Sequence, residues 1–516
     1  VTGQINVNGS ALSTEPEITL NASGAVTAGK TMMINSDGTT SQIAATTSAA
    51  TPIAWDTTFE YDTAAASPND SALAVDHINK RILFIYNNGS SNQAKARAGS
   101  IATDGTVTWG SETTINGNSG GGGRSFSVCF MGNDSGNSRF AIGYLRQVTS
   151  YAYPTAAMIS VDSSRVITKS NEASLGSVQF SILGTTVCYH ETEGKLLWMG
   201  RKISNSRMQY GVADVDLTNT TSPFDAPSGT GSGSFSDLAD VDNNGNYGRI
   251  YLQRGSNASV YDPDTEQIVT CFNGGSYHTE VNASVIKIVG NTITNHNLTV
   301  VKNAGATGGA SVQYDKSLNT FVFQYSTNSG VFARAATLNS SGVFTFGTEV
   351  TVESQNRTFN SLASTQNGYF SAMFNDTGSK LGAKLITLSG TSLTVGSTAY
   401  GIGDGLNGEI ECTVYDPTSD KVYGFIQRNV GPKIVRLSTT TTTTTSEKFI
   451  GIANNSASNG QSVAVRTFGG TNSNQSSLTT GSLYYIQKDG TLSTSADSPS
   501  VEAGIALSAT KLLIKG

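Results

Sequence analysis

Residues Val414–Gln427, VYDPTSDKVYGFIQ, decide the fold of this 516-residue chain. They predict the end of one strand, a tight turn over residues 416–420 and the start of a second strand. Proline presets the backbone at the first central position of a turn, and Asp and Ser side chains bond the local backbone there. Lys421–Ile426 then supplies the β-branched and aromatic residues that suit a half-buried strand. The stretch therefore predicts a β-hairpin.

The same hairpin recurs along the chain. Val260–Val269 (VYDPDTEQIV) is nearly a copy, and Gln313–Phe323 (QYDKSLNTFVF) follows the same pattern. Four further stretches follow the pattern less closely. We mark each of the seven copies by one residue of its turn: Asp76, Asn133, His190, Asp262, Asp315, Gln366 and Asp416. Successive markers are 57, 57, 72, 53, 51 and 50 residues apart, so the six steps join seven units.

A second hairpin completes each unit. Gly99–Gly110 (GSIATDGTVTWG) and Ala335–Gly347 (AATLNSSGVFTFG) place Asp-Gly or Ser-Gly between apolar runs, which is a strong hairpin signal. Each unit thus holds about four short strands, and such a repeat is typical of a propeller blade. We expect an all-β fold with a β-propeller of about seven blades over residues 56–438. Serial sandwiches or a β-solenoid fit less well, because the period is too long for a solenoid rung.

Composition limits the function classes. Only 14% of the residues are charged, 56 are glycine, and the formal net charge is −6. A nucleic-acid-binding protein needs a basic face, so we expect no nucleic-acid partner. The chain has no run of 18 apolar residues, so we expect no membrane-spanning helix and no membrane partner. Few stretches keep a 3.6-residue apolar period for more than two turns, which favours short strands over helices.

The two ends of the chain differ from the repeats. Residues 1–45 and 448–516 each read as short strands with Gly-containing turns, while 46–55 and the threonine-rich 439–447 read as linkers. Because chain ends usually lie close together and domains insert at exposed loops, we expect both ends to form one small, discontinuous β-barrel or sandwich domain. The alternative is two separate β modules.

These flanks carry a resemblance to a known group of proteins. Near the start, Gly24–Lys30 (GAVTAGK) precedes Asn35–Thr39 (NSDGT); near the end, Phe449–Ala453 (FIGIA) precedes Asn459–Val465 (NGQSVAV), and Ala503–Ile514 follows. The motifs resemble tail-fibre-like and head-decoration-like structural proteins of tailed bacteriophages, especially marine and cyanobacterial phages. The resemblance covers about a fifth of the chain. It implies a virion component whose flanking domain docks on other virion proteins, and it carries over no catalytic residue.

We therefore expect a non-enzymatic protein of the virion surface, and a homo-oligomer. Its propeller would be displayed outward, for contact with a host-surface glycan or receptor at the tail. Capsid decoration or a head fibre is the alternative site. The sequence leaves two further classes open, a glycan-cleaving propeller enzyme and a bacterial surface adhesin. An enzyme of that kind would carry a cluster of carboxylates in the axial funnel.

Few residues suggest chemistry, and we expect no catalytic residue and no cofactor. Residues 240–245 match the first half of a calcium loop, with candidate ligands Asp240, Asp242 and Asn244. Tyr251 stands at the twelfth position, where the bidentate Glu of such a loop belongs. A polar turn is therefore the competing interpretation of this stretch.

Aromatic residues are the remaining candidates, because exposed rings stack on sugar faces. Trp109 and Trp198 fall in expected strands, where packing between blades is the favoured role. Tyr151 and Tyr153 lie near Pro154 in an expected loop, where they would be exposed.

Overall fold

The computed structural model describes residues 6–7, 10–11, 15–35, 37–44, 46–60, 69–88, 93–116, 123–148, 151–174, 180–202, 207–228, 235–236, 239–241, 258–274, 280–303, 305–355, 360–365, 368–375, 381–400, 409–427, 433–443, 446–487, 489–496 and 500–515. The chain divides into two compact units, residues 1–48 with 441–516 and residues 49–440. Within the described ranges, no helix is long and apolar enough to cross a membrane.

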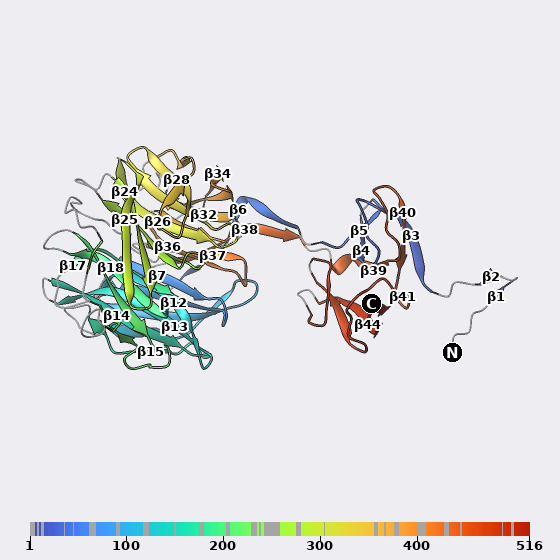
Figure 1. Ribbon diagram of the computed structural model, residues 1–516, viewed down its shortest axis with the longest axis horizontal. Helices are drawn as coiled ribbons and strands as arrows, with labels where there is room; N and C mark the ends of the chain where they lie inside the picture. The colour runs from blue at the N-terminus through green and yellow to red at the C-terminus, as the bar shows by residue number, and fades with distance from the viewer. Residues whose placement is uncertain are drawn as a thin grey trace. The chain divides into compact units, whose positions relative to one another are not determined.

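The described part of the larger unit forms seven antiparallel sheets, numbered here as blades in chain order (Figure 1). The first blade contains β7 (Asn69–Asp76), β8 (Arg81–Asn88), β9 (Gln93–Ile101), β10 (Val107–Trp109) and β11 (Thr113–Asn116). The second contains β12 (Gly123–Asp134), β13 (Asn137–Val148), β14 (Tyr151–Val161), β15 (Ile167–Lys169) and β16 (Ala173–Ser174). The third contains β17 (Phe180–His190), β18 (Lys195–Lys202), β19 (Met208–Val215), β20 (Phe224–Asp225) and β21 (Ala239–Asp240).

The next three blades repeat this order. The fourth contains β22 (Ser259–Asp262), β23 (Gln267–Gly274), β24 (Glu280–Val289) and β25 (Thr292–Lys302). The fifth contains β26 (Ala306–Asp315), β27 (Thr320–Thr327), β28 (Gly330–Leu338), β29 (Phe344–Phe346) and β30 (Val350–Glu353). The sixth contains β31 (Asn360–Ser364), β32 (Tyr369–Asn375), β33 (Leu381–Ser389), β34 (Ser392–Val395) and β35 (Ala399–Tyr400).

The seventh blade joins strands from distant parts of the sequence. It contains β36 (Glu409–Asp416), β37 (Lys421–Gln427) and β38 (Lys433–Thr443), and its outer strand is β6 (Thr46–Glu60), which precedes the first blade (Figure 1). Residues 46–55 and 439–443 therefore belong to strands, and the chain still passes between its two compact units within them, as expected of linkers. Their Thr-rich composition suggested linkers, but a β-branched side chain also suits a strand.

The first strand of each blade is the innermost one, and these strands close a ring. Each of them contacts the first strand of the next blade, from β7 and β12 through to β31 and β36, and β36 contacts β7 in turn. Apolar side chains fill the space between neighbouring blades: Leu83 and Ile85 of the first blade pack with Phe126, Phe140 and Tyr144 of the second. The expected seven-bladed β-propeller is thus confirmed.

The recurrent hairpin takes one backbone conformation in several blades. Lys80, Glu266, Asn319 and Asp420 each lie four positions after a marker aspartate, and each has a φ between 47° and 55°. That left-handed region is uncommon for residues other than glycine. The marker aspartates themselves are buried, and their carboxylates accept hydrogen bonds from the backbone N–H groups of the turn. The same turn is therefore rebuilt by the same local interactions.

The smaller unit, called the paired-end unit (residues 1–48 and 441–516), joins both ends of the chain. One five-stranded sheet has the order β3 (Glu17–Asn21), β40 (Ser462–Arg466), β39 (Phe449–Ala453), β4 (Thr31–Ile34) and β5 (Thr40–Gln42). Another has the order β41 (Thr471–Asn472), β45 (Lys511–Ile514), β44 (Glu502–Ser508), β42 (Leu483–Ile486) and β43 (Leu492–Ser493). The short pair β1 (Asn6–Val7) and β2 (Ser10–Ala11) and the 3-10 helix η2 (Ser446–Lys448) complete it.

The two five-stranded sheets share one apolar core. Phe449 and Ile452 of β39 are buried together with Ile486 of β42, Leu512 and Ile514 of β45. In the first sheet, two strands from the end of the chain lie between strands from its start, because β3 pairs with β40 and β4 pairs with β39. Neither chain end could complete this sheet alone, so the expectation of one discontinuous β domain is confirmed.

Candidate functional site

A cavity of about 570 Å³ lies on the axis of the propeller. Its lining comes from the innermost strands, or the turns that follow them, of all seven blades. A space bordered by every blade of a closed ring lies at the centre of that ring. The lining residues are Leu73, Ala74, Val75, His77, Val128, Phe130, Glu191, Val260, Tyr261, Pro263, Gln313, Tyr314, Lys316, Ser364, Thr413, Val414, Tyr415 and Pro417.

The sequence repeat explains why aromatic side chains gather there. Tyr261, Tyr314 and Tyr415 each directly precede the marker aspartate of their hairpin, and Phe130 lies near the same end of β12. Because equivalent positions of successive blades surround the axis, one repeated position becomes a ring of side chains. Tyrosine at this position in three blades therefore gives the cavity an aromatic wall.

Hydrogen bonds at the hydroxyl group hold these tyrosines in place. Tyr415 donates to Asp420 Oδ1 at 3.0 Å, within its own hairpin. Tyr261 shares a bond of 2.8 Å with the hydroxyl group of Thr192 in the neighbouring third blade. Burial and the nearby Asp420 carboxylate raise the pKa of Tyr415, so its phenol stays protonated and remains a donor. Both rings are fixed at their polar end.

Tyr314 is the most enclosed of the three and links two blades. It is 3% exposed, its hydroxyl group donates to the Asp264 carboxylate of the fourth blade, and its oxygen lies 3.1 Å from Asn319 Oδ1 of its own turn. Burial, together with the Asp264 and Asp262 carboxylates, raises its pKa. The side chain is thus a fixed part of the wall between the fourth and fifth blades.

Charged groups are few and lie at exposed positions. His77, Glu191 and Lys316 each follow a marker residue directly, and all three are exposed. The His77 ring meets the Phe130 ring edge-on, with ring centroids 6.0 Å apart. Glu191 is the one carboxylate among the described lining residues, so this lining does not supply the carboxylate pair that glycosidases use.

A belt of buried hydroxyl groups lies along the innermost strands beside the cavity, and one of its members, Thr413, also lines the cavity. Each blade contributes one residue to this belt, namely Ser71, Ser127, Thr186, Ser259, Ser311, Ser361 and Thr413. Several of them bond across a blade boundary: Thr186 donates to Ser259 at 3.0 Å, and Ser361 and Thr413 lie 2.9 Å apart. Small polar side chains therefore let the strands approach one another, while the hydroxyl groups of these two pairs satisfy each other across the boundary.

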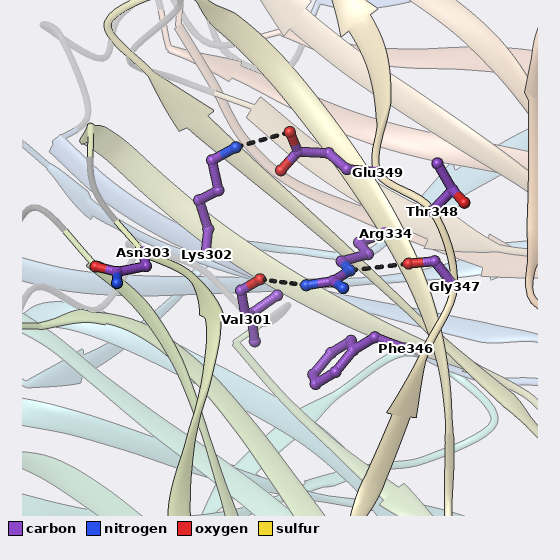
Figure 2. A pocket seen from close by; sticks show the side chains of 8 residues that line it. All are labelled: Val301, Lys302, Asn303, Arg334, Phe346, Gly347, Thr348 and Glu349. Atoms are coloured by element: carbon purple, nitrogen blue, oxygen red, sulfur yellow. Dashed lines mark hydrogen bonds and ion pairs between the residues drawn. The ribbon is translucent and has the colours of Figure 1, made fainter.

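A second hollow, of about 530 Å³, lies at the boundary between the fourth and fifth blades. Figure 2 shows Arg334 donating to two backbone carbonyls, Val301 O at 3.0 Å and Gly347 O at 2.9 Å. The guanidinium also lies 4.5 Å from the centroid of the Phe346 ring. Lys302 pairs with Glu349 at 2.7 Å (Figure 2). The charged side chains of this hollow bond to one another or to backbone carbonyls of the two blades. We therefore interpret these contacts as a structural brace between the fourth and fifth blades.

A pairing of tyrosine, carboxylate and cation recurs in three blades, where the outer strand is interrupted. Tyr325 donates from its hydroxyl group to the carboxylate of Glu349, which lies in the break between β29 and β30. The first and second blades contain the same pairing, between Tyr86 and Glu112 and between Tyr144 and Glu172. In each case a cationic side chain joins the carboxylate. Three repeats of one arrangement favour a structural role.

The candidate calcium ligands are only partly described. Asp240 ends β21, where its carboxylate accepts hydrogen bonds from Arg207 at 2.6 Å and from Gln209 at 2.8 Å. Asp242 and Asn244 lie outside the described residues. Among those that are described, no group of three or more His, Cys, Asp or Glu side chains could hold a metal ion.

The structure places three of the aromatic candidates, Trp109, Trp198 and Tyr153, in strands. Trp198 is fully buried between the second and third blades. Trp109, in the first blade, packs against the apolar core that the first and seventh blades share. Tyr153 lies in β14, half-buried and paired with Arg146, so it belongs to a strand and not to the expected loop. Tyr261 and Tyr415 were missed as site residues, although the repeated Tyr-Asp-Pro signal marked both of them.

The sequence was also compared with known proteins. No family model and no curated protein matches it. Among solved structures, the β-propeller domain of Cps50 (Swd1) from Myceliophteria thermophila is similar at 10% sequence identity. The match covers 75% of this chain and 99% of that chain, with a TM-score of 0.44. The strand pairing described above carries the fold assignment.

Proposed function

We propose that this chain is a non-enzymatic structural component of a tailed-phage particle. The paired-end unit attaches it to other particle proteins, and the propeller is carried outward to contact the host surface at the tail. The observation that carries the proposal is the insertion. Strands of both chain ends share one sheet, and the chain passes between the units through the neighbouring strands β38 and β6. One attachment domain thus holds the whole ring by two adjacent connections.

Other features support an attachment role for the paired-end unit. Its exposed surface includes large apolar side chains: Ile18 is 40% exposed, Ile34 45%, Phe468 50% and Leu507 46%. Exposed apolar side chains of this size are removed from water when another protein covers them. The resemblance of the same segments to tailed-phage structural proteins points the same way.

The propeller is suited to binding better than to catalysis. Its axial cavity combines fixed aromatic rings with few charges, and its described lining holds one carboxylate, Glu191. Hydrolysis of a glycosidic bond uses two carboxyl groups, roughly 5–9.5 Å apart. A ring that binds without cleaving would keep the particle at the host surface.

The location of the chain tests the proposal. DNA-containing particles from the source culture would be banded in a density gradient and analysed by mass spectrometry. Antibodies against the purified full chain would then label the particles for electron microscopy. We expect the chain in the particle band at a constant ratio to the other particle proteins, with label at the tail. Label on bacterial cells and absence from the band would favour a bacterial surface adhesin and refute the proposal.

A further inference from the structure

We propose that the axial cavity binds a neutral saccharide of pyranose rings, stacked on Tyr261 and Tyr415. The inference rests on the proposed function, because it names the class of surface molecule that the outward ring would contact. Small-molecule sites are typically concave, with volumes of roughly 300–1,000 Å³. The cavity, at about 570 Å³, falls within this range and is shared by seven blades.

The aromatic wall matches one chemical feature of a sugar. A pyranose ring carries C–H groups on its faces and hydroxyl groups around its edge, so its faces pack on aromatic rings. Tyr261 and Tyr415 line the cavity while hydrogen bonds to Thr192 and Asp420 hold their hydroxyl groups. A ring that is already fixed loses little conformational freedom on binding, which favours affinity.

The polar lining matches the hydroxyl groups of the sugar. Gln313, Ser364 and Thr413 come from the fifth, sixth and seventh blades and all line the cavity. Amide and hydroxyl side chains both donate and accept hydrogen bonds, as sugar hydroxyl groups do. These residues lie on three adjacent innermost strands. They would therefore form hydrogen bonds with one side of a sugar that stacks on the aromatic wall.

The charges of the lining favour a neutral ligand over an ionic one. Glu191 and Lys316 contribute one negative and one positive side chain, and His77 is the remaining titratable group at the exposed positions. Recognition of phosphate or carboxylate groups usually relies on clustered Arg and Lys, and no Arg belongs to the described lining.

A glycan array tests the inference with the purified full chain. The array would carry defined neutral oligosaccharides of glucose, galactose, mannose, rhamnose and N-acetylhexosamines, beside acidic ones, and isothermal titration calorimetry would measure each hit. We expect a neutral oligosaccharide to bind with a Kd of about 1 mM or tighter. We expect Tyr261→Ala and Tyr415→Ala to weaken binding by about tenfold or more, while Tyr415→Phe retains most of it.

Two further variants separate loss of the site from loss of the fold. Lys316→Trp changes an exposed residue of the lining, so it should leave folding intact while its bulk obstructs the cavity and abolishes binding. Tyr485→Ala removes a half-buried tyrosine of the paired-end unit and should bind as the unmodified chain does. Binding that survives both Tyr261→Ala and Lys316→Trp, hits on acidic glycans only, or no hit at all would overturn the inference.

The proposed function can be judged separately from this inference. A chain that is found in the particle band but binds no neutral saccharide refutes the ligand and leaves the particle role standing. A chain that binds through the cavity but is absent from particles refutes the particle role and leaves the saccharide site standing.

Discussion

Ser138 donates a hydrogen bond of 2.6 Å from its hydroxyl group to the buried carboxylate of Asp76, across the boundary between the first and second blades. Arg81, two residues before Leu83 in β8, donates to the same hydroxyl group at 3.0 Å and to Val161 O at 2.7 Å. The marker residue of the recurrent hairpin therefore has two roles. It caps its own turn, and it joins one blade to the next.

Replacing Asp76 should destabilise the propeller. The carboxylate accepts hydrogen bonds from the N–H groups of Ile78 at 2.9 Å and Asn79 at 3.1 Å, besides the bond from Ser138. Because Asp76→Ala leaves the buried Ser138 hydroxyl group and two partly buried N–H groups without this acceptor, we expect a loss of about 3 kcal/mol in the free energy of unfolding. All three tryptophans lie within residues 49–440, so their fluorescence during urea unfolding reports on this unit.

The control for this change is Asp104→Ala in the same blade. Asp104 also caps a turn, accepting from the N–H of Thr106 at 2.8 Å, but that bond is exposed. Water replaces an exposed partner, so the expected loss is below about 1 kcal/mol. Equal losses from the two variants would contradict the view that the marker aspartate holds blades together.

The hydroxyl group of Tyr325 should stabilise the fifth blade. It donates to the Glu349 carboxylate, and bonds to charged groups contribute roughly 1.5–3 kcal/mol each. We expect Tyr325→Phe to lower the free energy of unfolding by about that amount. Tyr210→Phe is the matched control, because the described structure gives that buried ring no hydroxyl partner, and its effect should stay within about 0.5 kcal/mol. Similar effects at both positions would refute the bracing role.

The fold was largely predictable because it is a repeat. Tyr-Asp-Pro in two hairpins and Tyr-Asp in a third gave the turn, the period and the number of blades from local chemistry alone. The same residues hold the aromatic wall, yet no local signal says that Tyr261 and Tyr415 face one cavity. That fact depends on closure of the ring, which brings together positions more than 150 residues apart.

The seventh blade was harder to predict for a similar reason. Residues 46–60 carry no hairpin signal, because their partner β38 lies almost 400 residues later. The low sequence complexity of this segment predicts a linker, whereas its pairing with the distant strand β38 makes it a strand. Thr439–Thr443 shows the same conflict, and the β propensity of threonine prevails once a neighbouring strand is present.

The strand β6 should be required for a closed ring. A fragment of residues 46–443 retains it, whereas a fragment of residues 61–443 leaves β38 as an unpaired outer edge. Exposed edges of this kind promote aggregation. We expect the longer fragment to be monomeric with a single cooperative thermal transition by circular dichroism. The shorter one should aggregate or melt at least about 10 °C lower. Equal melting temperatures would show that β6 is dispensable.

The stability of the propeller should fall below neutral pH because of His190. Its side chain is fully buried: Nδ1 accepts the N–H of Glu193 at 3.3 Å, and Nε2 lies 3.2 Å from Glu266 O of the fourth blade. A neutral ring with its proton on Nε2 satisfies both contacts, and protonation of Nδ1 would break the first. Burial lowers the pKa of His190, although the bond to Glu266 O and the nearby Glu193 and Glu266 charges oppose this.

The sign of the pH effect follows from where the proton binds. The unfolded chain takes up a proton near pH 6.5, while folded His190 resists it, so acidification below about pH 6.5 favours unfolding. His190→Gln removes this titration and keeps an amide donor for Glu266 O. We expect the variant to be less stable than the unmodified chain at pH 7.5, with a gap that narrows at pH 5.5 in urea unfolding followed by tryptophan fluorescence. Since the other histidines are common to both proteins, their contributions cancel, and parallel stability curves would exclude His190 as the cause.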